Sequence, residues 1–198
     1  MPPTKTNLAL RRVVRLVALL NFAYFGIEFA VARSIGSVSL FADSIDFLED
    51  AAVNFLIIVA LGWTAQHRAQ VGMVLAGILL VPGIATLFTA WEKFNNPLPP
   101  AALPLTLAAL GALVVNLSCA FMLTRYRHHS GSLTKAAFLS ARNDAFANVA
   151  ILIAAFITAL TLSAWPDLIV GLGIAVLNAD AAREVWNAAR EERKTAQS

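Results

Sequence analysis

Residues 41–54 read FADSIDFLEDAAVN, and this stretch decides how the chain is interpreted. It places four carboxylates inside an apolar run that extends over about residues 38–63. At about 100° per residue, one helical stripe holds Asp43, Asp46, Asp50 and Asn54. Asp46 and Asp50 are neighbours four residues apart, so their carboxylates stack on one face. Such a pair repels itself unless a cation or protons lie between the two groups.

The whole chain has the composition of a membrane protein. Of its 198 residues, 59% are hydrophobic and only 14% are charged, and the mean hydropathy is +0.70. Soluble domains are about 45–50% apolar and about 25% charged, and disordered chains have the opposite composition. The single cysteine, Cys119, excludes a disulfide framework and a Cys₄ or Cys₂His₂ zinc site.

Six apolar stretches are long enough to cross a bilayer as helices, which needs about 20 residues each. They predict an all-α membrane protein with spans at 13–33, 38–63, 70–91, 102–124, 133–160 and 166–186. The separators are short and polar, so neighbouring spans run antiparallel. We therefore expect a cytoplasmic N-terminal tail (1–12), a six-helix transmembrane domain (13–186) and a short cytoplasmic tail (187–198).

The basic residues predict the orientation of the chain in the membrane. Only Arg33 and Lys93 fall in the loops of one side. The other side holds Lys5, Arg11, Arg12, Arg15, Arg68, Arg125, Arg127, Lys135, Arg183, Arg190, Arg193 and Lys194. Both termini are therefore expected to be cytoplasmic, with the protein in the plasma (inner) membrane. The same bias explains the basic charge without a nucleic-acid partner.

A second polar set lies in the fifth span. Ser140, Asp144 and Asn148 are spaced by four residues and share a helix face. If the second and fifth helices pack together, Asp46, Asp50 and Asp144 supply three carboxylates, and Ser140 or a water supplies a fourth ligand. Charges at bilayer depth cost about 2.5–3.5 kcal/mol each, so their presence indicates function. Oxygen ligands of this number form a plausible divalent-cation site.

Other polar residues have structural alternatives. Asp43 either joins the ligands or only forms a local hydrogen bond, and Glu49 points away from the 46/50 stripe. Arg142 could neutralise one carboxylate and turn part of the cluster into an ion pair. Whether Asn143 contributes to the site stays open.

Three asparagines, Asn54, Asn116 and Asn148, have the character of interhelical hydrogen-bonding residues, although Asn148 could also contribute to the site. Glu28 and Glu92 are expected near the membrane interfaces.

The chain resembles the cation diffusion facilitator family. The resemblance rests on residues 28–54, on WEKFNNP at 91–97, on Asn116 and on Asp144 followed by Asn148. It covers about residues 10–190, the whole membrane part.

The resemblance implies a function. Members of the family export divalent transition metals from the cytoplasm, usually in exchange for protons, and are typically homodimers with six spans per protomer. Their transport site takes a His or Asp and an Asp from each of the second and fifth helices, which here implies Asp46, Asp50, Ser140 and Asp144. Zinc is the first expected substrate, with cadmium, cobalt, manganese and iron(II) open. No organic cofactor and no enzymatic activity are implied.

This sequence departs from the family pattern in two ways. Ser140 stands where a His or Asp is expected, so the site has no nitrogen ligand and leans towards harder ions. Proton coupling would then use Asp carboxylates. The chain also stops at Ser198, so we expect it to lack the family's cytoplasmic metal-binding domain and to dimerise, if it does, through its membrane part.

Three other interpretations remain open. The chain could be a metal-binding membrane regulator, or the partner subunit of a full-length homologue. A membrane enzyme with paired carboxylates is disfavoured, because no nucleophile has an adjacent base. A transporter of organic cations would need an aromatic-lined cavity, and the tryptophans are scattered.

Overall fold

The computed structural model describes residues 5–60, 84–124 and 131–195. Its helices are α1 (Lys5–Ile35), α2 (Val38–Ala60), α4 (Ala102–Thr124), α5 (Gly131–Thr161) and α6 (Trp165–Thr195). Residues 84–95 form a further helical segment, and no strand occurs in the described ranges. The prediction of an all-α chain is confirmed.

The helices agree with the predicted spans in place and order, but α1 begins at Lys5 and α6 ends at Thr195, so both run into the predicted tails at 1–12 and 187–198. The predicted span 102–124 has the same bounds as α4, and the second span begins where α2 begins, at Val38. Most of the third span lies outside the described residues, and its end overlaps the helical segment 84–95.

Three of the described helices are long and apolar enough to cross a membrane: Ala9–Ile35, Ala102–Thr124 and Ala141–Thr161. Helix α2 is also long enough to cross a membrane, but it is not among these three because its carboxylates make it too polar.

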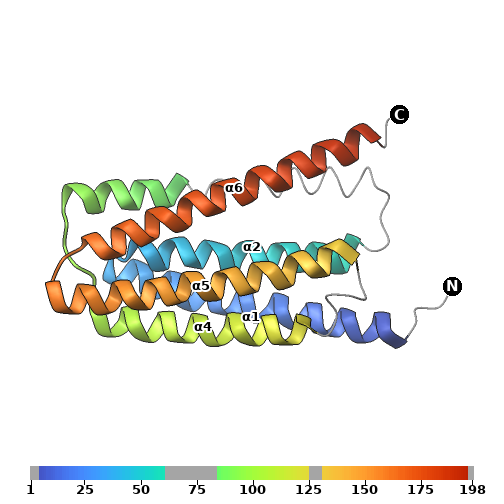
Figure 1. Cartoon of the computed structure of the whole chain (residues 1–198), viewed down its shortest axis with the longest axis horizontal. Helices are drawn as coiled ribbons and strands as arrows, with labels where there is room; N and C mark the ends of the chain where they lie inside the picture. The colour runs from blue at the N-terminus through green and yellow to red at the C-terminus, as the bar shows by residue number, and fades with distance from the viewer. Residues whose placement is uncertain (1–4, 61–83, 125–130, 196–198) are drawn as a thin grey trace.

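Figure 1 shows the helices running along one long axis, with both termini at the same end of the bundle. The α1–α2 turn, the segment before α4 and the α5–α6 turn all lie at the opposite end, which we call the loop end. Helix α2 occupies a central position, because it packs against α1, α5 and α6. Any polar group on α2 is thereby placed next to several other helices.

The core and the surface are both apolar, as expected for a protein surrounded by lipid. The main core cluster joins Leu40 and Ile45 of α2 to Leu105 of α4, Ile151 of α5 and Ile174 of α6. Many large hydrophobic side chains point outward instead: they include Phe88, Leu103, Phe121, Phe146 and Leu160. An exposed apolar surface of this kind indicates contact with a membrane or another apolar partner.

The α1–α2 turn is held by backbone geometry. Gly36 has a φ of 64°, a left-handed conformation that glycine adopts without steric cost. The amide of Ser37 donates to the carbonyl of Ala32 at 3.0 Å, which closes the end of α1 as a Schellman motif. The turn brings α2 back antiparallel to α1 and sets the start of its polar stripe.

Candidate metal site

The polar stripe of α2 lies in the interior of the bundle. Asp43 is fully buried and Asp50 nearly so, while Asp46 and Glu49 are half-buried. The side-chain amide of Asn21 on α1 donates to the carboxylate of Asp50 at 3.5 Å. The helix–helix contacts thus carry these acidic groups inward, away from the lipid-facing surface.

Asp144 of α5 is brought to the same part of the bundle. It is half-buried, and it is the charged group that interacts most strongly with Asp46 across the α2–α5 contact. Cys119 of α4 interacts electrostatically with both Asp50 and Asp144. The expectation that α2 and α5 bring their carboxylates together therefore agrees with the arrangement of the helices.

The carboxylates are near each other but are not gathered as a finished ligand cage. Within the described residues, no three His, Cys, Asp or Glu side chains are placed so that they could hold a metal ion together. Ser140 lies on α5, but its side chain falls outside the described part of the structure. The ligand set Asp46, Asp50, Ser140 and Asp144 therefore stays a prediction.

The neighbouring polar residues form a chain of hydrogen bonds across three helices, α4, α5 and α2. The side-chain amide of Asn148 on α5 donates to Asp43 of α2. The oxygen of Asn148 accepts from the amide of Asn116 on α4 at 3.0 Å. Asn54 bonds within its own helix, to the carbonyl of Asp50 at 2.8 Å. Asn116 and Asn148 thus link helices.

One alternative left open by the sequence is excluded, and one expectation is wrong. Arg142 is exposed and donates to its neighbour Asn143 at 3.2 Å, so it is not a buried counter-charge for the acidic cluster. Glu28 was expected near an interface, but it is fully buried. Its position depends on which face of α1 meets α2, and the sequence of α1 alone does not determine that.

A second polar cluster, at the loop end, was not found from the sequence. The buried carboxylate of Asp167 at the start of α6 accepts from the hydroxyls of Ser37 and Ser39, both at 2.6 Å. It also accepts from the backbone amides of Val38 at 2.9 Å and Ser39 at 3.2 Å. Asp167 thus caps the N-terminus of α2 from another helix. The serines at the start of α2 were the available signal.

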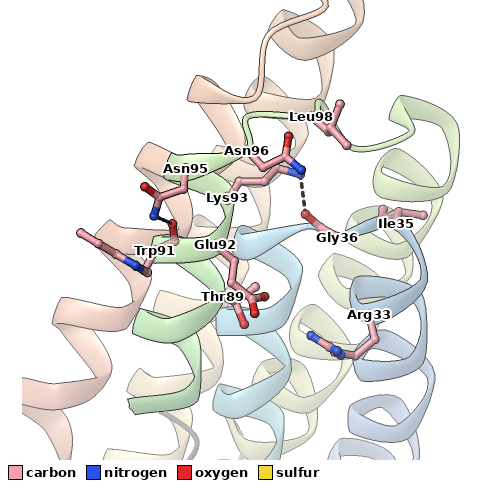
Figure 2. A pocket seen from close by; sticks show the side chains of 10 residues that line it. All are labelled: Arg33, Ile35, Gly36, Thr89, Trp91, Glu92, Lys93, Asn95, Asn96 and Leu98. Carbon is pink, nitrogen blue, oxygen red and sulfur yellow. Dashed lines mark hydrogen bonds between the residues drawn. The ribbon is translucent and has the colours of Figure 1, made fainter.

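An open hollow of about 620 Å³ lies beside this cluster. Arg33 lines it from α1 and Glu92 from the helical segment 84–95 (Figure 2). Lys93 reaches across and donates to the carbonyl of Gly36 at 2.6 Å, as the dashed line shows. Burial lowers the pKa of Lys93 below its ordinary value of 10.5, and the negative charge of Asp167 opposes that shift.

Comparison with known proteins agrees with the fold. The family model of the cation efflux transmembrane domain matches residues 14–191. No curated protein matches the chain.

Proposed function

Because the chain belongs to the cation efflux family, we propose that it exports a divalent transition-metal ion in exchange for protons. The family transports metal cations across membranes, and zinc is the first substrate to test here. One observation carries the proposal: Asp144 of α5 is the charged group that interacts most strongly with Asp46 of α2 inside the bundle. Like charges kept together at this depth need a cation or protons between them.

The proposed ligands of the metal are Asp46, Asp50 and Asp144, with Ser140 or a water as the fourth. Only deprotonated carboxylates coordinate a metal, so metal and protons compete for the same groups. Alternating exposure of the site to the two sides of the membrane converts this competition into exchange. An oxygen-only site favours harder ions than a site with imidazole does, so cadmium, cobalt, manganese and iron(II) belong in the same comparison.

We further propose that both termini are cytoplasmic in a plasma (inner) membrane. The two termini lie at one end of the bundle (Figure 1), and the sequence predicts the excess of Lys and Arg on the same side of the membrane as the termini. The working unit is proposed to be a homodimer whose contact is made by the membrane helices.

The test is metal flux into proteoliposomes that contain only this protein. Zinc, cadmium and manganese are offered with and without a pH gradient, to the wild type, to Asp50→Ala and to Glu92→Gln. Glu92 is an exposed carboxylate outside the cluster, so its variant controls for loss of charge. We expect gradient-dependent flux in the wild type and in Glu92→Gln, and none in Asp50→Ala.

The alternative function is a metal-binding regulator or a subunit that needs a full-length partner. The departure at Ser140 favours that alternative, because it removes one expected ligand. Folded protein that binds zinc by calorimetry but transports no metal would establish the alternative and refute transport by this chain alone.

A further inference from the structure

Glu28 is the least compensated charged group in the described part of the chain. It lies on α1, has no exposed surface, and neither of its carboxyl oxygens has a donor partner among the described residues. A buried acceptor without a donor costs about 1–3 kcal/mol, and more if it is charged. A group kept in such a place needs a ligand that satisfies it.

The side chain that faces Glu28 is another carboxyl. Glu28 interacts more strongly with Asp43 of α2 than with any other charged group, and the two carboxyls are within hydrogen-bonding reach. One oxygen of Asp43 accepts from Asn148, while the other has no donor among the described groups. Two carboxyl groups, each with an oxygen that lacks a donor among the described residues, therefore lie next to each other inside the bundle.

The groups described on the surrounding helices offer no compensation. The hydroxyl of Tyr24 on α1 gives its proton to the carbonyl of Ala108 on α4 at 2.6 Å. Asn116 on α4 donates to Asn148, whose own amide donates to Asp43. Asp46, the nearest acid along α2, adds a further negative charge.

On α6, Asn178 donates to the carbonyl of Ala42 at 3.5 Å and not to a carboxyl. None of the described Lys or Arg side chains forms an ion pair with Glu28 or Asp43.

We propose that Glu28 and Asp43 form a proton-binding site in which one buried proton bridges the two carboxyls. As anions, the two groups can only accept, so they cannot bond to each other. One added proton turns either group into a donor and satisfies the facing oxygens of both. Carboxyl pairs that share a site hold one proton for this reason.

A proton fits this position better than a metal ion. Among the described residues, the group that hydrogen-bonds to Asp43 is the donor side of the Asn148 amide, which repels a cation. Even with Asp46 nearby, the carboxyls here are fewer than the four ligands that a divalent ion takes in a closed site. The idea that this proton is exchanged for metal rests on the proposed function. The presence of the proton between Glu28 and Asp43 does not depend on it.

The test is infrared difference spectroscopy of the purified protein near neutral pH. We expect a carbonyl band from a protonated buried carboxyl that shifts in heavy water and is lost in both Glu28→Gln and Asp43→Asn. Glu92→Gln, which changes an exposed carboxyl, should leave the band intact. A band that persists unchanged in both pair variants, or that is absent from the wild type, would overturn the proposal.

Zinc calorimetry on the same samples separates the proton from a metal and this site from the transport site. We expect Glu28→Gln to bind as many zinc ions per chain as the wild type does. Loss of one zinc ion would overturn the proposal in favour of a cation site. If no sample binds zinc while the infrared band behaves as expected, the proton site stands and the proposed transport function fails.

Discussion

Asp167 and Glu28 are both carboxyl groups with no exposed surface, yet their surroundings are opposite. Asp167 receives four donors from the start of α2: two hydroxyls and two backbone amides. Glu28 receives none from the described residues and faces Asp43 instead. One carboxyl closes the loop end of the bundle, and the other lies between α1 and α2 near the acidic stripe.

The difference separates a structural carboxylate from a functional one. Burial of a charge is tolerated when hydrogen bonds replace its hydration, and Asp167 meets that condition. Glu28 meets it only by binding something that the protein does not itself supply. Buried polar groups without hydrogen-bond partners break a rule that most of a protein obeys, and such exceptions concentrate at functional sites. We therefore assign a ligand to Glu28 and none to Asp167.

The largest effect is expected from Asp167→Asn. The variant replaces one acceptor oxygen with a donor, so at least one amide or hydroxyl at the start of α2 loses its partner. Because hydrogen bonds to charged groups contribute about 1.5–3 kcal/mol each, we expect a loss of about 3 kcal/mol in the free energy of unfolding. Denaturant unfolding in detergent micelles, followed by tryptophan fluorescence, measures it.

The control for Asp167→Asn is Glu92→Gln, the same chemical change at an exposed position of the loop end. Its effect should stay within about 0.5 kcal/mol, as for most surface substitutions. Equal losses of unfolding free energy in the two variants would show that the four hydrogen bonds to Asp167 do not stabilise the fold.

An intermediate effect is expected where α6 meets the same end of α2. A Cβ atom at Gly171 would lie 2.7 Å from the amide nitrogen of Ser39 and from two atoms of Val38, including its backbone carbonyl carbon. Backbone cannot move aside as a flexible side chain can, so Gly171→Ala should push the helices apart. We expect a loss of about 2 kcal/mol in the free energy of unfolding, in the range of overpacked cores.

Gly173 is the matched control, because a Cβ atom there meets nothing within 4 Å. Gly173→Ala should be neutral or stabilising by up to about 1 kcal/mol, since alanine favours helix. If both variants destabilise equally in the same assay, the loss at Gly171 does not come from the close approach of α6 to α2.

The sequence was sufficient for features that depend on a single helix. Hydropathy located the spans, and spacing placed Asp46 and Asp50 on one face. The roles of Glu28 and Asp167 depend on contacts between helices, over long sequence separations. Asp167 caps a helix that begins 129 residues earlier in the chain, and no local pattern carries that information. Ser140 was chosen from its helical spacing to Asp144 and from the family resemblance, and its contribution stays a prediction.

The smallest effect is expected from Glu28→Gln, although it removes a carboxyl as deeply buried as Asp167. If a proton already bridges Glu28 and Asp43, the wild-type group is a neutral donor, and the glutamine amide also donates to Asp43. We therefore expect the free energy of unfolding to change by less than about 0.5 kcal/mol in the same micelle assay. The same substitution chemistry would then cost far more at the loop end than between α1 and α2. A loss as large as that of Asp167→Asn would instead mean that Glu28 is a charged structural group, and the contrast between the two carboxyls would disappear.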